Sequence, residues 1–297
     1  MVPRDPIISV SHLAKRYGRK QALAGLSLRV EAGEIFGFLG PNGAGKTTTI
    51  RLLLGLLRPS HGTARVLDRP IGPAGTATRA EVGYLPGELS LWRGFTGWHT
   101  LRFLEQLTQR PAVDRDALLD RFGLADADLR RPIRTYSDGM KQKLGVVQAL
   151  QCRPRLAFLD EPTKGLDPLV QQAFYDTLAH ARSQGMTIFF SSHILSEVER
   201  VCDRVAMLRD GAIVAAGTID SVLASQRRRV RIVFRAPTDS SAFDRFGEVL
   251  SRSDTRVELL VARTEIPELV WQLSAAAVDD LTIEPLSLED AFLEHYR

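Results

Sequence analysis

The sequence is poor in cysteine and lacks any long hydrophobic run. Its two cysteines, Cys152 and Cys202, lie far apart among 297 residues and outside the spacings typical of metal or redox sites. A reducing cytoplasm is their simplest setting, and we assign them no chemistry. No apolar run reaches the roughly 18 to 20 residues that span a bilayer, and residues 1–5 do not begin a signal peptide. Any membrane role is therefore expected to act through a partner.

Charge of neither sign is in large excess. The net charge of +4 and the pI near 9.3 permit contact with nucleic acid or an anionic membrane surface, but a solvated surface explains them more simply. The hydrophobic fraction of 44% supports a buried core, and the length leaves room for one large domain or for one plus a small one.

Residues 40–47 fit the G-x-x-x-x-G-K-[ST] pattern of a phosphate-binding loop. An apolar segment at 35–39 predicts a buried strand before the loop, and helical spacing predicts a helix after it that continues until Pro59. Lys46 would place its charge on the β and γ phosphates, and Thr47 would offer Mg²⁺ a hydroxyl. The predicted nucleotide-binding residues of this loop are Gly40, Pro41, Asn42, Gly43, Ala44, Gly45, Lys46, Thr47 and Thr48.

Two further buried strands are predicted to end in polar residues. Residues 156–159 are apolar and lead to Asp160 and Glu161, the pattern of a parallel strand that delivers acids at its C-terminal edge. Asp160 would help to hold Mg²⁺, and Glu161 could orient a water. Residues 187–190 lead to a Ser-Ser-His triplet at the same edge, whose His193, taken alone, is more simply a structural histidine.

A mostly helical insertion is predicted from about residue 95 to residue 150. Apolar residues recur at helical spacing within 99–109 and 116–122. Ser137 is a good N-cap beside Gly139, and the helix that it begins would present an N-terminus to an anion.

Aromatic residues at two places allow two interpretations each. Tyr17 could stack on an adenine, a contact worth roughly 1 to 3 kcal/mol, or it could be an ordinary surface residue. The apolar cluster at 89–98, which includes Trp92 and Phe95, is either a local core or a docking surface for another protein.

The pattern of the large core stops between residues 221 and 229. The elements predicted from there on are a solvated basic linker at 227–229, strands near 230–235 and 257–261, a helical segment with Phe243, Phe246 and Leu250, and a capping box at Ser287 and Asp290. Residues 226–297 are therefore expected to form a small α+β domain, in which no catalytic cluster is recognisable.

The motifs together resemble the ATP-binding subunit of an ABC transporter. The phosphate loop is followed by Tyr-Ser-Asp-Gly-Met at 136–140, Leu-Asp-Glu at 159–161, Gly-Leu-Asp at 165–167 and Ser-Ser-His at 191–193. The resemblance covers about the first 220 residues, and the overall pattern is similar to exporters of the drug-resistance (ABC-2) type. It implies an α/β P-loop NTPase fold with a mixed sheet and a helical subdomain at about 88–152, within a nucleotide-binding domain at 1–225.

The resemblance also implies an ATPase that works as a head-to-tail dimer. A homodimer, or a pair with a related ATPase subunit, would hold two ATP molecules with Mg²⁺. It would power transport, with export favoured, through a separate permease at the cytoplasmic face of the membrane. No nucleic acid partner is expected.

Each matched residue takes an implied role from the family. The catalytic set would be Lys46, Glu161 as general base and His193 as sensor of the γ-phosphate. The remaining roles are adenine stacking by Tyr17, Mg²⁺ binding by Thr47 and Asp160, contact with the partner's nucleotide by Ser137 and Gly139, and a cross-dimer loop at Asp167.

Two positions depart from the family pattern. Gly87 stands where a Gln usually contacts Mg²⁺ and water, so Glu88 or a water would have to replace it. Asp138 stands where the signature often has Gly, and its charge would repel phosphate unless the side chain points away. Both departures concern the rate of turnover rather than ATP binding.

Two other functions compete with the transporter. A soluble ABC-type ATPase that acts on nucleic acid or ribosomes agrees with the basic pI, but the chain has neither a long coiled-coil insertion nor a second ATPase half. A small-molecule P-loop kinase would explain Lys46 but would leave Ser137 and His193 without a role.

Overall fold

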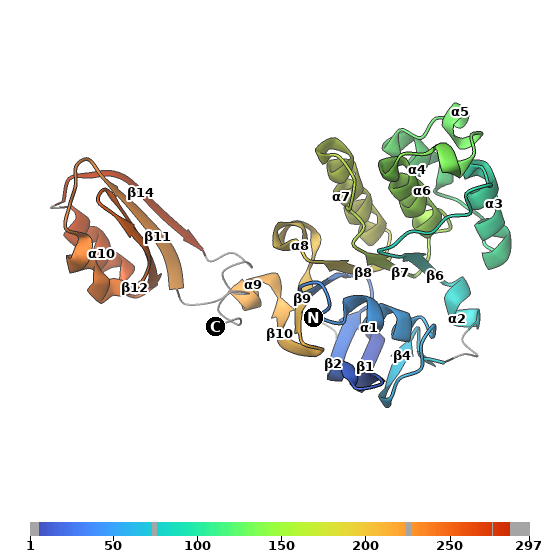
Figure 1. Ribbon diagram of the computed structural model, residues 1–297, viewed down its shortest axis with the longest axis horizontal. Helices are drawn as coiled ribbons and strands as arrows, with labels where there is room; N and C mark the ends of the chain where they lie inside the picture. The colour runs from blue at the N-terminus through green and yellow to red at the C-terminus, as the bar shows by residue number, and fades with distance from the viewer. Residues whose placement is uncertain (1–5, 73–75, 224–226, 275, 286–297) are drawn as a thin grey trace. The chain divides into compact units, whose positions relative to one another are not determined.

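The computed structural model describes residues 6–72, 76–223, 227–274 and 276–285. The chain divides into two compact units, Met1–Ile219 and Asp220–Arg297 (Figure 1). The sequence boundary expected at 225/226 stays a prediction. Within the described residues, no helix is both long and apolar enough to cross a bilayer.

A six-stranded sheet forms the centre of the first unit. Its strand order is β10-β9-β3-β8-β7-β6, and every neighbouring pair is parallel except β9 and β10. The strands are β3 (Ile35–Leu39), β6 (Val82–Leu85), β7 (Leu156–Asp160), β8 (Thr187–Ser192), β9 (Arg204–Arg209) and β10 (Ala212–Thr218). Every residue of β3, β7 and β8 is buried, as the apolar runs predicted. Because β3, β7 and β8 are parallel, their C-terminal ends meet at one edge.

A second, antiparallel sheet covers the helix that follows the phosphate loop. It contains β1 (Pro6–Tyr17), β2 (Lys20–Glu31), β4 (His61–Val66) and β5 (Arg69–Pro70) in the order β2-β1-β4-β5. Ile8 of β1, Phe38 and Phe158 of the central sheet, and Ile50 of helix α1 (Lys46–Leu53) belong to one buried cluster. This shared core holds α1 firmly at the edge where the chemistry is expected.

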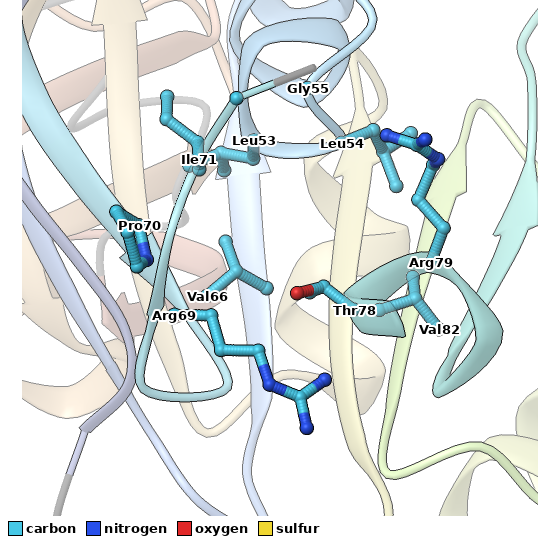
Figure 2. A pocket seen from close by; sticks show the side chains of 11 residues that line it. Leu53, Leu54, Gly55, Val66, Arg69, Pro70, Ile71, Thr78, Arg79 and Val82 are labelled. Atoms are coloured by element: carbon cyan, nitrogen blue, oxygen red, sulfur yellow. The ribbon is translucent and has the colours of Figure 1, made fainter. Parts of the chain in front are cut away.

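Helix α1 ends earlier than predicted, at Leu53 instead of near Pro59. Gly55 takes a left-handed backbone with φ 68°, and its N–H bonds to the Leu52 carbonyl and closes the helix. Figure 2 shows the end of α1 beside β4, β5 and α2 (Thr76–Ala80), around a cavity of about 10 Å³ that is too small for a ligand. The prolines and glycines between residues 66 and 83 favour loop and turn, but β5 and α2 form there before the strand β6.

Helices α3 to α6 follow β6 and precede β7, clustered at one side of the first unit (Figure 1). Their bounds are α3 (Gly97–Thr108), α4 (Arg115–Phe122), α5 (Asp126–Leu129) and α6 (Asp138–Leu150), with a 3-10 turn η1 (Ile133–Thr135). The positions of α3 and α4 confirm the helices predicted from the spacing of apolar residues at 99–109 and 116–122. Two more helices flank β8, namely α7 (Pro168–Ser183) and α8 (Leu195–Val201).

The second unit is a four-stranded antiparallel sheet packed against a helix. Its strand order is β12-β13-β11-β14. The elements are α9 (Ile219–Leu223), which begins at the boundary, β11 (Arg227–Phe234), η2 (Ser240–Phe246), β12 (Gly247–Ser253), β13 (Arg256–Ala262), α10 (Ile266–Leu273) and β14 (Val278–Pro285). This mixture of strands and helices confirms the small α+β fold expected there.

Two predictions within this unit are wrong. Residues 227–229 are not a linker, because they form the start of β11. Arg229 lies 3.3 Å from Glu258 of β13, and this ion pair accounts for an arginine within the strand. Phe243 and Phe246 are buried in the 3-10 turn η2, whereas Leu250 belongs to β12, so their spacing did not mark one helix. The predicted capping box at 287–290 lies outside the described residues.

Candidate nucleotide site

An open cleft of about 590 Å³ contains most of the predicted nucleotide-binding residues. It is lined by Tyr17, Lys20, Ala22, Pro41, Asn42, Gly43, Gly45, Lys46, Thr47, Thr48, Arg51, Gly87, Glu88, Asp160, Glu161 and Lys164. Gly40 and Ala44 are buried behind the lining, where the Gly40 carbonyl accepts a hydrogen bond from Lys46 at 2.6 Å. Lys20, Arg51 and Lys164 add three basic side chains that sequence reasoning did not single out.

The phosphate loop has the backbone that its glycines allow. Gly43 and Gly45 have φ values of 85° and 112°, which L side chains rarely adopt. A Cβ atom on Gly45 would lie 2.8 Å from the Ala22 carbonyl oxygen, so this position has no room for a side chain. The loop leads directly into the N-terminus of α1 at Lys46, whose backbone N–H groups attract an anion.

Asp160 is the most completely enclosed acid of the site. It ends β7 with no exposed surface, and its Oδ2 accepts a hydrogen bond from the Thr47 hydroxyl at 2.7 Å. Its Oδ1 accepts a hydrogen bond from the Ser191 hydroxyl. Sequence reasoning placed Ser191 at this edge without giving it a function, although the parallel pairing of Asp160 with Ser191 sets the two side by side.

The oxygen atoms at and beside Asp160 are of the kind that binds Mg²⁺. Hydroxyl and carboxylate oxygens are its usual protein ligands, and it commonly takes one or two carboxylates and completes its shell with phosphates and water. Thr47 and Asp160 offer this kind of set beside the phosphate loop. Among the described residues, no group of three or more His, Cys, Asp or Glu side chains could hold a metal ion.

Glu161 points away from Asp160 and connects two of the predicted catalytic residues. Its backbone is left-handed, with φ 50°, immediately after the strand ends. Its Oε1 lies 3.2 Å from Lys46 Nζ, and its Oε2 lies 2.5 Å from His193 Nδ1. Lys46, Glu161 and His193 are therefore brought together, although the exposed His193 does not line the cleft itself.

Ser137, Gly139 and Asp167 lie outside the cleft lining of their own chain. Ser137 is exposed and caps α6, since its hydroxyl accepts from the Met140 N–H at 3.2 Å. Asp167 is exposed and caps α7 by accepting from the Leu169 N–H. The structure thus confirms the predicted N-cap but does not bring these residues to the phosphate loop of the same chain.

The structure shows what surrounds Gly87 and Asp138, the two residues that depart from the family pattern. A Cβ atom on Gly87 would lie 3.2 Å from Asp160 Oδ2, so Gly87 sits directly against the acid, while Glu88 is exposed on the cleft. The Asp138 carboxylate is 95% exposed and lies 2.8 Å from Lys141 Nζ, and this hydrogen bond holds the pKa of Asp138 below its usual value.

Known proteins match both units of the chain. Residues 23–164 match the protein family described as ABC transporter, and residues 226–284 match the C-terminal domain of EvrA-like ABC transporters. A solved structure of the ATP-binding subunit of an ABC transporter superposes with a TM-score of 0.68 at 30% identity, covering 73% of this chain and 91% of that one. The expected ABC ATPase fold is thereby confirmed.

Relatives with curated names support the same family. An uncharacterized ABC transporter ATP-binding protein of Nostoc is 47% identical over 69% of this chain and 62% of its own length. The uncharacterized ABC transporter ATP-binding protein YdbJ of Bacillus subtilis is 34% identical over 98% of this chain and 95% of its own. The daunorubicin/doxorubicin resistance ATP-binding protein DrrA of Streptomyces peucetius is 38% identical over 76% of this chain and 70% of its own. The chain thus belongs to the ATP-binding proteins of ABC transporters.

Proposed function

We propose that the chain is one half of a head-to-tail dimer that hydrolyses two ATP molecules and drives export through a separate membrane permease. One observation carries the proposal. The cleft contains the phosphate loop, Asp160 and Glu161, whereas Ser137, Gly139 and Asp167 lie outside it. A second copy, turned head to tail, would bring its Ser137 and the N-terminus of α6 to the open side of this cleft.

The roles proposed for these residues in ATP hydrolysis follow from where negative charge develops on the nucleotide. Negative charge grows on the γ-phosphoryl oxygens, and Lys46 with the partner's α6 N-terminus would stabilise it. Bound Mg²⁺, held by Thr47 and Asp160, would neutralise part of the phosphate charge. Glu161 would position the attacking water and accept its proton late, because a carboxylate is a weak base towards water. His193, in contact with Glu161, would sense the γ-phosphate.

The surface near α3 is our candidate for the permease contact. Trp92 is 54% exposed, and its ring centroid lies 5.1 Å from that of Phe95 and 5.2 Å from that of Phe103. Of the two interpretations of this apolar cluster, the exposed aromatic face favours docking of a cytoplasmic helix of the permease. The chain would then act as a peripheral protein on the cytoplasmic face of the membrane. Similarity to DrrA favours a drug-like exported compound.

The substitution Glu161→Gln tests the dimer and the reaction together. The amide keeps the shape of the side chain but cannot accept the proton, so we expect kcat to fall by at least about a hundredfold. ATP affinity should remain, and light scattering with Mg-ATP should show a stable dimer because its bound nucleotide persists.

The matched control is Glu268→Gln, the same chemical change at an exposed site on α10 that does not line the cleft. It should leave both kcat and the oligomeric state unchanged. Full-speed hydrolysis by a chain that stays monomeric at every concentration would overturn the proposal, and so would wild-type phosphate release by Glu161→Gln.

A further inference from the structure

One buried carboxylate has no place in the reaction just described. Glu197 lies in α8 with 5% of its surface exposed. A buried carboxylate destabilises the fold unless hydrogen bonds compensate for its lost water. The hydroxyl of Ser192, itself fully buried at the end of β8, donates to Glu197 Oε2 at 2.7 Å.

The same serine hydroxyl fixes the backbone on both sides of His193. While it donates to Glu197, it also accepts a hydrogen bond from the Ile194 N–H at 3.0 Å. The Ser192 hydroxyl oxygen therefore links residue 192 to the backbone of residue 194, and its hydrogen bond to the buried Glu197 fixes its position. His193 lies between them, with Nδ1 2.5 Å from Glu161 Oε2.

The Glu197 carboxylate also interacts with the Tyr175 hydroxyl, which connects it to α7 and not to His193. Tyr175 of α7 hydrogen bonds to Glu197, and burial, together with the negative charge of Glu197, raises the pKa of Tyr175 to about 12. Tyr175 is therefore a protonated donor at neutral pH. The Arg200 guanidinium lies 4.8 Å from the centre of the Tyr175 ring and is hydrogen bonded to Gln172 of α7. Glu197 thus has two hydroxyl donors: Ser192, which is next to His193 in the chain, and Tyr175, which belongs to α7.

We propose that Glu197 is a positioning residue for hydrolysis, which acts by holding Ser192 and thereby aiming the imidazole of His193 at Glu161 and the γ-phosphate. The inference rests on the proposed role of His193. Neither Glu197 nor Ser192 lines the cleft, so neither is expected to contact ATP. Their loss should change the rate of the chemical step rather than the affinity for ATP.

The two hydroxyl donors provide a matched pair of substitutions in the full chain. Ser192→Ala and Tyr175→Phe each remove one donor to the same buried carboxylate, and both should lower the melting temperature. Ser192→Ala should also lower kcat about tenfold with KM for ATP within about twofold, since a small misplacement of a catalytic group is costly. Tyr175→Phe should leave kcat within about twofold. Equal losses of kcat in both variants would overturn the inference by showing a purely structural role.

Glu197 itself is tested by removal and by conservative replacement. Glu197→Ala should lower kcat as much as Ser192→Ala, and if it does not fold, Ser192→Ala still decides the question. Glu197→Gln should restore most of kcat, because its amide oxygen can accept from Ser192 and its amide nitrogen can donate to Tyr175. A Gln variant that folds and binds ATP but is as slow as Ser192→Ala would contradict the inference.

A double-mutant cycle separates this inference from the proposed function. If Ser192 acts through His193, adding Ser192→Ala to His193→Ala should cause no further loss of kcat. A full additional tenfold loss would show that Ser192 acts by another route. If His193→Ala has wild-type kcat, the proposed role of His193 fails. If His193→Ala is slow while Ser192→Ala and Glu197→Ala are not, only the present inference fails.

Discussion

The inner and outer parts of the candidate site are built in opposite ways. The inner part is the cleft, where Lys46 is 6% exposed and Asp160 is fully buried, and both are held by groups from other elements. The outer part consists of Ser137, Gly139 and Asp167. Ser137 and Asp167 are exposed, and each accepts a hydrogen bond from the first turn of the helix that it caps. One part is complete within a single chain, and the other presents caps to the surface.

This contrast has a physical reason. Buried polar groups must find hydrogen-bond partners inside the fold, so the inner part is fixed before any ligand arrives. Exposed helix N-termini keep their positive ends accessible and can serve an anion on another molecule. If the reaction needs both parts, as we propose, a chain that keeps them separate completes its reaction centre only when it pairs with a second one.

Complementation between inactive chains is the strongest test of this contrast. Lys46→Ala damages the inner part, Ser137→Ala damages the outer part, and each homodimer should lose at least about a hundredfold in kcat. In a mixed head-to-tail dimer, one site carries both defects and the other carries none. Random mixing should therefore restore up to about a quarter of wild-type activity, measured as phosphate release.

The control mixes two chains that are damaged in the same part. Lys46→Ala with Asp160→Asn leaves one defect in each site of a mixed dimer, so no activity should return. Recovery in this control, or no recovery in the Lys46 and Ser137 mixture despite proven mixed dimers, would contradict a reaction centre shared between chains.

The candidate site could be predicted best where the sequence signal is local. The phosphate loop, the strand that ends at Asp160 and the Ser137 cap depend on neighbouring residues, and the structure has the loop, the strand and the cap at those positions. Contacts that depend on strand pairing could not be predicted. Ser191 meets Asp160 only because β7 and β8 pair in one register, 31 residues apart in sequence.

Packing between elements explains the other gaps. Ser192 and Glu197 are close in sequence, but nothing in their spacing shows that the acid is buried under α7 with Tyr175 beside it. The arginines at 227–229 have the composition of a solvated linker, yet their pairing with β13 makes them part of a sheet. Local composition cannot reveal partners that a distant strand supplies.

Tyr17 gives a moderate test of the inner part. It is 45% exposed at the cleft, with Lys15 Nζ 5.1 Å from the ring centre, so one face of the ring could receive an adenine. Tyr17→Ala should raise KM for ATP about tenfold with kcat nearly unchanged, because stacking on a base contributes roughly 1 to 3 kcal/mol. Tyr17→Phe keeps the ring and should match the wild type. An unchanged KM in Tyr17→Ala would show that the residue is only part of the surface.

Asp138, which lies between Ser137 and Gly139, should give the smallest effect of the substitutions considered. The carboxylate is paired with Lys141 at 2.8 Å and is almost fully exposed, so water and the nearby cation screen its repulsion. Asp138→Asn should therefore change kcat by less than about twofold, at both low and physiological salt. Lys141→Ala is the informative partner, since it leaves the carboxylate charged without that cation and should slow hydrolysis slightly, mainly at low salt. If Asp138→Asn instead raised kcat several-fold, the carboxylate would face the partner's phosphates, and the outer part would not be adapted to receive them.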